Sequence, residues 1–325
     1  MCRRRLFVPG LLLVCLGGLS LEVSASRGEE PSARKLLLIG IDGCRPDALR
    51  AARTPHLDAL AEAGKLVEGT LILSPRYRRS NTVSGPGWSS ILTGVWADKH
   101  GVHDNSFQGK QYDRFPHFFQ RLKQHDPDCF TASLVTWAPI HEHIVAGADL
   151  SRVLEGAEKN DHAGADLLAA REAADILREA KTTAVFAYFG QVDETGHRKG
   201  FHPTVPEYVQ AIERVDAHVG TLVDAVRARP RYAEEEWLFL VGTDHGGRGT
   251  DHGGGHDVPE ILETFLIVSG PSVDRSAIAG PTYMVDLPVT ALVHLGVAID
   301  PRWQLDGRPL GVRPPAAGHP VPARE

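Results

Sequence analysis

Cysteine is one of the rarest residues in this sequence, with four among 325 residues. Cys2 and Cys15 lie within the first 25 residues, and Cys44 and Cys129 lie in the remainder. At most one disulfide bond can therefore form in the main part of the chain, which excludes a scaffold held by several disulfides. The sequence leaves open whether Cys44 and Cys129 pair.

Long apolar runs are also scarce, and the longest, residues 6–21, lies at the N-terminus behind three arginines. Small residues at positions 23–25 offer a cleavage point, so residues 1–25 are predicted to be a secretory signal peptide. A membrane anchor is the weaker alternative, because Pro9 and several glycines interrupt a run shorter than the ~20 residues of a span. We expect a periplasmic or secreted protein without a stable membrane span.

The chain has no excess of basic residues, since 35 Lys and Arg face 41 Asp and Glu. Removing residues 1–25 takes away three arginines and Glu22, which changes the net charge from −6 to −8. A nucleic acid duplex is therefore an unfavourable partner. Repeats of the period typical of solenoids or propellers are absent as well. No feature of the sequence indicates an oligomeric state.

Short apolar runs alternate with helix-like segments along the chain, which is the pattern of an α/β protein. A helix is expected from Thr54-Pro55 to Ala63, before Gly64. Residues 26–308 are expected to form a single catalytic domain, followed by a Pro-rich tail at 309–325. The further predicted strands are 35–41, 66–73, 130–136, 184–189, 237–241 and 264–268, and the further helices are 163–180 and 206–228.

Three apolar runs give way to a carboxylate, at Asp42, Asp193 and Asp244. Ligands gather at the carboxyl ends of strands in an open α/β sheet, so these residues are expected to meet in space. Three histidines accompany them in the sequence: His197, His245 and His252. Three Asp and three His suit a pair of divalent cations such as Zn²⁺, and two metals about 4 Å apart can clamp an in-line displacement at phosphorus.

The segment at residues 82–94 supplies a hydroxyl nucleophile for such a centre. Pro86 suits the first turn of a helix that runs to about Thr93, which places Ser84 and Gly85 just ahead of the helix N-terminus. The partial positive charge there favours an alkoxide and a bound phosphate. Thr82 and Ser89 are the alternative hydroxyls.

Five motifs occur in a fixed order along the chain: IDG at 41–43, the segment 84–94, KHGV at 99–102, VDETGH at 192–197 and TDHGG at 243–247. With these motifs the sequence resembles the alkaline phosphatase superfamily, in particular its type I phosphodiesterase/nucleotide pyrophosphatase branch. The resemblance implies a three-layer sandwich with a largely parallel central sheet and helices on both faces.

The resemblance also implies two zinc ions. Asp193, His197 and a late histidine would hold one ion. Late ligands of this family are typically followed by glycine, which favours His252 over His256 and leaves Asp251 as a loop residue. The implied ligands of the other ion are Asp42, Asp244, His245 and the Ser84 hydroxyl.

The activity that the resemblance implies is an exported, metal-dependent hydrolysis of phosphodiester or pyrophosphate bonds in a small phosphorylated substrate, through a covalent phosphoserine at Ser84. A phosphomonoesterase, a phosphoryl or sulfuryl ester hydrolase, and a non-catalytic binding protein are the alternatives. Gly87 stands where nucleotide pyrophosphatases usually carry Asn, and Trp88 stands where sulfatases carry Arg, so a formylglycine sulfatase is disfavoured. Candidates for compensating the phosphate charge are Arg76, Arg78, Arg79, Lys99 and Asn105.

Overall fold

The computed structural model describes residue 1, residues 33–145 and residues 147–314. Residues 33–314 belong to one unit of the chain. The predicted signal peptide, apart from its first residue, and positions 315–325 of the Pro-rich tail lie outside the described residues.

A seven-stranded mixed sheet, in the order β2-β7-β6-β1-β5-β3-β4, forms the centre of this unit. The strands from β6 to β4 run parallel, and β7 pairs antiparallel with both β6 and β2. The predicted, largely parallel central sheet is therefore confirmed. The strands are β1 (Ala33–Ile41), β2 (Lys65–Leu71), β3 (Phe130–Val135), β4 (Leu150–Val153), β5 (Thr182–Phe189), β6 (Glu235–Gly242) and β7 (Glu263–Ser269).

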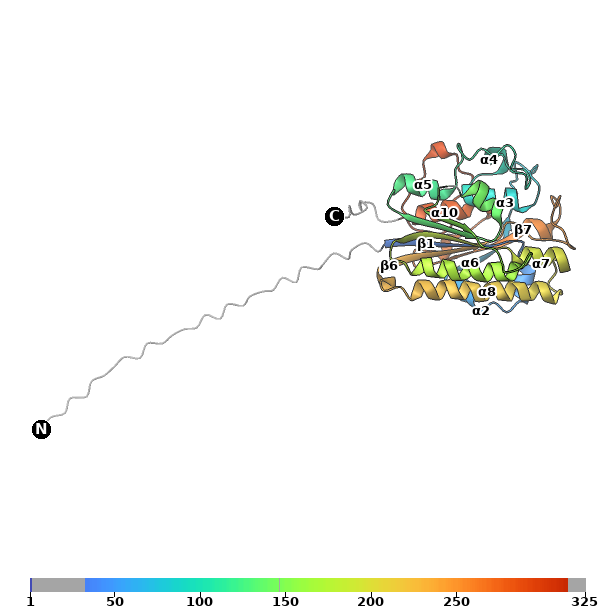
Figure 1. The fold of residues 1–325 in the computed structure, drawn as a ribbon. Coiled ribbons are helices and arrows are strands. Elements are labelled where there is room, and N and C mark those ends of the chain that lie inside the picture. Colours follow the sequence, from blue (N-terminus) through green and yellow to red (C-terminus); the bar gives the residue numbers. More distant parts are fainter. Residues whose placement is uncertain (2–32, 146, 315–325) are drawn as a thin grey trace. The chain divides into compact units, whose positions relative to one another are not determined.

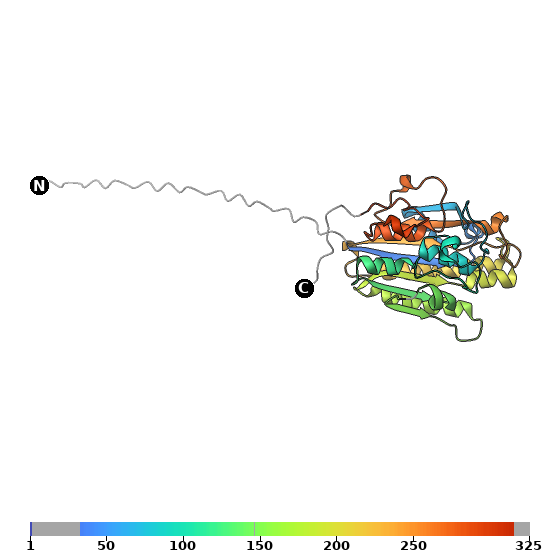
Figure 2. The same cartoon turned by 90° about the horizontal axis from the view of Figure 1, so that it is seen from above.

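Helices cover both faces of the sheet, which confirms the three-layer arrangement. Figure 1 shows α2, α6, α7 and α8 on one face and α3, α4, α5 and α10 on the other; Figure 2 shows the same layers from above. The helices are α1 (Pro46–Ala51), α2 (Pro55–Ala63), α3 (Ser84–Thr93), α4 (Ala97–His100), α5 (Phe118–His125), α6 (His162–Arg178), α7 (Gln191–Lys199), α8 (Pro206–Arg227), α9 (Pro259–Leu262) and α10 (Asp286–His294), with shorter turns η1 (Ile140–Ile144), η2 (Tyr232–Glu234), η3 (Arg275–Ala277) and η4 (Pro301–Trp303).

The central strand β1 is apolar throughout because both of its faces are covered. Leu37, Ile39 and Ile41 pack into the core on one side of the sheet. Leu36 and Leu38 pack into the core on the other side. Since successive side chains of a strand point to opposite faces, a continuous apolar run is what this position requires.

Helix α2 has the boundaries that its sequence predicts. Pro55 occupies its first turn, and Gly64 follows its last residue. A Cβ atom at Gly64 would lie 2.1 Å from the carbonyl oxygen of Val268 in β7, so close packing against the sheet also requires glycine there. The short strand β4, which is only partly buried, was not predicted from the sequence.

The two cysteines within the described residues, Cys44 and Cys129, are buried and have free thiols. Cys44 packs into one core layer and Cys129 into the other, so they do not pair in this structure. Among residues 33–145 and 147–314, no helix combines the length and the apolar character that crossing a bilayer requires.

Candidate active site and metal centre

The candidate site lies at the carboxyl ends of three neighbouring strands. Strands β6, β1 and β5 are adjacent and parallel, so their ends meet at one edge of the sheet. Asp42 follows the last residue of β1 directly, and Asp244 lies two residues beyond the end of β6. These two carboxylates, 202 positions apart in sequence, therefore share one location, as predicted.

Asp193 differs from the prediction, because it does not lie at a strand end. Strand β5 ends at Phe189, and Asp193 belongs to the first turn of α7. His197 follows one helical turn later, so both side chains lie on the same face, with 3.3 Å between Asp193 Oδ2 and His197 Nε2.

Asp166 on α6 anchors the start of α7. The residue is fully buried, and its carboxylate accepts hydrogen bonds from the backbone N–H groups of Gly190 (3.0 Å) and Gln191 (3.1 Å). The Thr136 hydroxyl at the end of β3 donates to it as well (2.9 Å). Sequence reasoning missed this residue, because an Asp inside an amphipathic helix carries no local signal of its partners.

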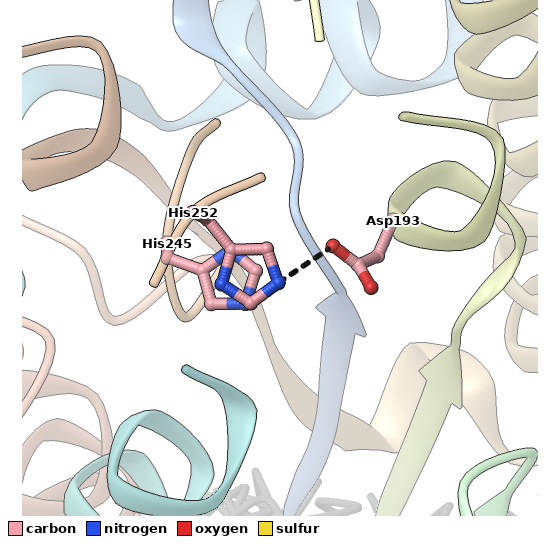
Figure 3. Close-up of side chains that lie close together, drawn as sticks. All are labelled: Asp193, His245 and His252. Carbon is pink, nitrogen blue, oxygen red and sulfur yellow. Dashed lines mark ion pairs between the residues drawn. The ribbon is translucent and has the colours of Figure 1, made fainter. Parts of the chain in front are cut away.

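Two groups of side chains could each hold a metal ion: Asp42, Asp244 and His245 form one, and Asp193, His245 and His252 form the other. Within each group the potential ligand atoms lie within 4.8 Å of one another. The His245 and His252 rings stack with their centroids 3.7 Å apart, and Figure 3 shows them facing the Asp193 carboxylate on its helix. His197 adjoins the second group, with its Nε2 atom 2.9 Å from that of His252.

The three histidines share one hydrogen-bonding pattern. Each Nδ1 atom lies 2.9 Å from a backbone carbonyl oxygen, that of Thr250 for His197, Gly246 for His245 and Thr82 for His252. A neutral imidazole that donates its Nδ1–H in this way leaves the Nε2 lone pair free. Metal-binding histidines commonly have this arrangement, and here all three lone pairs are directed into the cluster.

The carboxylates are also only partly satisfied by the protein. Trp88 Nε1 and the Tyr188 hydroxyl both donate to Oδ2 of Asp42, at 2.8 and 2.6 Å, which leaves Oδ1 for another partner. Asp193 Oδ1 and Asp244 Oδ2 are buried without a hydrogen-bond partner. Orphaned buried oxygens are costly, so the residues fit a bound cation.

Burial and mutual repulsion shift the acidities of these groups. Burial, reinforced by the charge of Asp193, raises the pKa of Asp42 to about 6, and burial together with Asp42 raises the pKa of Asp244 well above its usual range. Burial opposes ionisation of Asp193 too, but the hydrogen bond from His197 and the neighbouring histidines hold its pKa below the usual value. Metal ions would relieve this repulsion.

Burial also lowers the pKa of His252 to about 4, which favours the neutral imidazole that metal binding requires. The hydrogen bond to Asp193 raises the pKa of His197 to about 9. Without a metal, His197 therefore carries the proton that separates its Nε2 from that of His252.

Ser84 points into the cluster. Its Oγ lies 3.3 Å from His245 Nε2 and 3.5 Å from Asp42 Oδ1. The alternative hydroxyls are bonded elsewhere, Thr82 to the His252 carbonyl (2.5 Å) and Ser89 to the Gly85 carbonyl (2.5 Å).

The helix that carries this serine begins two residues earlier than predicted, at Ser84 instead of Pro86. Ser84 is the first residue of α3 and not the residue ahead of it. Pro86 occupies the third position, which is tolerated because the first backbone N–H groups of a helix have no partner within the helix.

The first copy of the duplicated Asp-His-Gly-Gly motif contributes Asp244 and His245 to the cluster, and the second copy contributes His252. His252 from the second copy lies in the cluster, whereas His256 bonds to the Ser80 carbonyl (2.8 Å). Asp251 accepts hydrogen bonds from the backbone N–H groups of His252 and Gly253, so it shapes the loop, as expected of a loop residue.

A cavity of about 200 Å³ opens onto the cluster. Asn105 lines it, and its Oδ1 accepts a hydrogen bond from the Gly85 N–H (2.7 Å), which leaves the amide Nδ2 as a donor. Arg76 and Lys99 instead pair with Asp306, at 2.8 and 2.6 Å, away from the cavity. A larger cavity of about 660 Å³ has none of the cluster residues in its lining.

Gly87 and Trp88, the two residues that depart from the pattern of related families, each have a structural reason. A Cβ atom at Gly87 would lie 2.7 Å from Cβ of Asp244, so no side chain fits there without displacing that carboxylate. Trp88 serves as the hydrogen-bond donor to Asp42.

Comparisons with known proteins identify the family. Residues 36–270 match the family described as type I phosphodiesterase/nucleotide pyrophosphatase. An uncharacterized pyrophosphatase/phosphodiesterase of Schizosaccharomyces pombe is 26% identical over 243 residues, covering 69% of this chain and 47% of the relative. Ectonucleotide pyrophosphatase/phosphodiesterase family member 7 of Rattus norvegicus is 24% identical over 253 residues, covering 73% and 55%. The chain thus spans about half the length of these curated relatives.

Solved structures share the fold. Murine ectonucleotide pyrophosphatase/phosphodiesterase 5, an inactive form in complex with AMP, superimposes with a TM-score of 0.59 and 14% identity, covering 82% of this chain and 96% of that one. A 2-O GAG sulfatase gives a TM-score of 0.66 and 13% identity, covering 86% and 73%. The family resemblance read from the five motifs is confirmed by the match over most of the chain. The chain therefore belongs to the type I phosphodiesterase/nucleotide pyrophosphatase family.

Proposed function

We propose that this protein is a phosphoesterase that hydrolyses phosphodiester or pyrophosphate bonds, with Ser84 as nucleophile, at a centre of two divalent cations, for which zinc is the best candidate. One observation carries the proposal. The Ser84 hydroxyl and the Nε2 atoms of three histidines converge on three carboxylates, and in two of these, Asp193 and Asp244, one buried oxygen has no hydrogen-bond partner. Nitrogen and carboxylate ligands in sets of three suit zinc with a position left open for substrate.

The chain offers a separate ligand set for each ion. Asp193, His197 and His252 would hold one, and Asp42, Asp244 and His245, with the Ser84 oxygen, would hold the other. This division follows the family resemblance and differs from simple proximity, which groups His245 with both sets. Bound there, the two cations would supply Lewis-acid stabilisation of the charge on the phosphoryl oxygens.

The remaining chemistry belongs to the chain itself. Ser84 Oγ loses its proton to solvent water and forms a bond to phosphorus, while the bond from phosphorus to the departing alcohol or phosphate oxygen breaks and that oxygen takes up a proton from solvent water. Water then cleaves the phosphoserine, so the phosphate product leaves and the serine hydroxyl is restored. The N-terminus of α3 and the Asn105 amide would stabilise the phosphoryl group.

The names of two curated relatives, pyrophosphatase/phosphodiesterases, support the bond type, and the N-terminal sequence supports export to the periplasm or outside the cell. Activity on bis-p-nitrophenyl phosphate, compared with p-nitrophenyl phosphate, tests the proposal in purified protein whose metal content is measured. We expect about two zinc ions per chain and faster turnover of the diester. Faster turnover of the monoester would make the protein a phosphomonoesterase, and no turnover with metal bound would favour a binding protein.

A further inference from the structure

Arg45 is a buried cation among the segments that carry the proposed metal ligands. It follows Asp42 by three positions, and only 6% of it is exposed. Its Nε and Nη2 atoms donate to the two carboxylate oxygens of Asp47, at 2.9 and 2.6 Å. This paired geometry fixes the plane of the guanidinium group and directs Nη1 away from Asp47.

The Nη1 atom of Arg45 joins two distant segments of the chain. It donates to the carbonyl oxygens of Phe201 (2.8 Å) and Gly247 (3.0 Å). The Phe201 N–H in turn donates to the carbonyl oxygen of Gly249 (2.7 Å). Arg45 and Phe201 therefore hold the loop at residues 247–250 against the segment that follows α7.

This loop orients His197. The carbonyl oxygen of Thr250, at the end of the loop, lies 2.9 Å from His197 Nδ1. A hydrogen bond from Nδ1 to that oxygen selects the tautomer whose Nε2 lone pair faces the cluster. A shift of the loop would therefore turn the His197 ring away from Asp193 and His252.

The Phe201 ring supports the same histidines. It is fully buried and meets the rings of His197 and His252 edge-on, with centroids 5.3 and 5.9 Å away and interplanar angles of 84° and 87°. A Cβ atom at Gly196 or at Gly247 would lie 2.2 Å from an atom of the Phe201 ring. The glycines of the motifs VDETGH and TDHGG thus leave the space that this ring occupies.

From these contacts we propose that Arg45 and Phe201 are positioning residues for one of the two metal ions, the one assigned to Asp193, His197 and His252. Neither residue is a ligand, and each acts through the backbone and the rings that orient the histidines. This inference rests on the proposed two-metal centre.

The other ligand set has supports of its own. Trp88 and Tyr188 donate to Asp42, at 2.8 and 2.6 Å. The backbone N–H of Gly43 donates to Oδ1 of Asp244 (3.3 Å). Loss of the Arg45 or Phe201 contacts should therefore weaken the binding of one ion and spare the other.

Zinc titrations of the full-length protein at buffered zinc concentrations test this difference. In Arg45→Lys and in Phe201→Leu we expect one zinc ion to bind about tenfold or more weakly and the other to bind with wild-type affinity. A lysine ammonium group can reach a carbonyl but lacks the planar fork that contacts Asp47 and both carbonyls at once. Arg45→Met should therefore weaken the same ion more than Arg45→Lys does.

Two matched variants separate positioning from a general loss of stability. Arg229→Lys is the control for Arg45→Lys, because Arg229 is 5% exposed, pairs with Glu235 and donates to the Glu179 carbonyl (2.8 Å). Strand β6 begins at Glu235, so this contact lies at the opposite end of the strand from the cluster. Both this control and Phe239→Leu, which truncates another buried ring of β6, should lower the melting temperature and keep two zinc ions at wild-type affinity.

A double variant identifies which ion is affected. His252→Ala removes a proposed ligand of the positioned ion, so the remaining zinc ion should bind to Arg45→Lys/His252→Ala as it does to His252→Ala alone. A further loss of affinity in the double variant would show that Arg45 acts on the other ion, which overturns the assignment.

The outcomes distinguish this inference from the function on which it rests. If the wild type binds fewer than two zinc ions, the proposed metal centre fails. If the wild type binds two, a variant that keeps both at wild-type affinity overturns the positioning role of the residue it replaces, while the centre stands. Equal weakening of both ions, or the same weakening in the matched controls, would also overturn that role.

Discussion

The Nε2 atoms of His197 and His252 lie 2.9 Å apart, and the Nδ1 atom of each ring faces a backbone carbonyl oxygen. With both Nδ1 atoms protonated, two lone pairs face each other, so the pair needs a proton or a metal ion to be stable. Without a metal, a proton on His197 satisfies this pair, but Asp193 Oδ1 and Asp244 Oδ2 stay buried without a hydrogen-bond partner, which destabilises the metal-free fold.

Metal removal should consequently lower stability as well as activity. We expect zinc added to chelator-treated protein to restore turnover and to raise the melting temperature by about 5–10 °C at concentrations near 100-fold above Kd. Thermal unfolding with and without zinc measures this, and Mg²⁺, which prefers oxygen ligands, is the comparison ion. Equal melting temperatures with and without every divalent ion tested would contradict the metal centre.

Replacing Ser84 by alanine should remove the nucleophile and keep most metal ligands. We expect turnover of bis-p-nitrophenyl phosphate to fall by at least about 10³-fold while zinc content stays close to that of the wild type. Ser89→Ala is the control, because the Ser89 hydroxyl bonds to the Gly85 carbonyl and to Tyr112, at 2.5 and 2.7 Å. If Ser84→Ala retained full turnover, the nucleophile would be another hydroxyl, with Thr82 and Ser89 as candidates.

The two late histidines should behave differently. His252 lies in the cluster, so His252→Ala should remove about one bound zinc ion per chain and most activity. His256→Ala should keep both ions, because His256 bonds to the Ser80 carbonyl. Metal analysis of the two purified variants decides the assignment, and the opposite pattern would make His256 the ligand.

Stability of the metal-free protein should depend on the ionisation of Asp42, whose pKa burial raises to about 6. A carboxyl with a raised pKa stabilises the folded state below its unfolded pKa of about 4, and this contribution is lost as the pH rises through 6. Metal-free Asp42→Asn should therefore be more stable than metal-free wild type at pH 8, by on the order of 2 kcal/mol, with a difference that shrinks towards pH 4.

Denaturant unfolding in the presence of a chelator measures this difference at each pH. Asp257→Asn provides the control, because that side chain is 99% exposed. Added zinc should reverse the order, since the variant loses a proposed ligand. An Asp42→Asn protein that is less stable than wild type at every pH without metal would show that the carboxylate repulsion is unimportant.

Local sequence was sufficient to predict a helix or strand when all the residues that define it lie within one short segment. The boundaries of α2 follow from Pro55 and Gly64, and the buried run of β1 led directly to Asp42. Local sequence was insufficient where an element depends on a residue that is distant in the sequence. Asp193 was placed at a strand end because its preceding residues are apolar, but β5 ends at Phe189 and α7 begins at Gln191, where Asp166 from another part of the chain accepts hydrogen bonds from the backbone N–H groups.

The hydrogen bonds that orient the ligands were also invisible in the sequence. Nothing in the sequence indicated that Tyr188 and Trp88 both donate to one oxygen of Asp42. Asn105 was one of several candidates for contacting the phosphate, and its place in the cavity depends on its hydrogen bond from Gly85, which the sequence did not show.

The sequence by itself determined the alternation of strands and helices, the inventory of Asp and His ligands and the family, because periodicity, turn residues and motifs are properties of short segments. The tertiary structure alone decided which residues meet. Strand order brings β6, β1 and β5 side by side, and this pairing joins segments about 200 positions apart through contacts that no local pattern encodes. The raised pKa values of Asp42 and Asp244 and their shared need for a cation follow from that order.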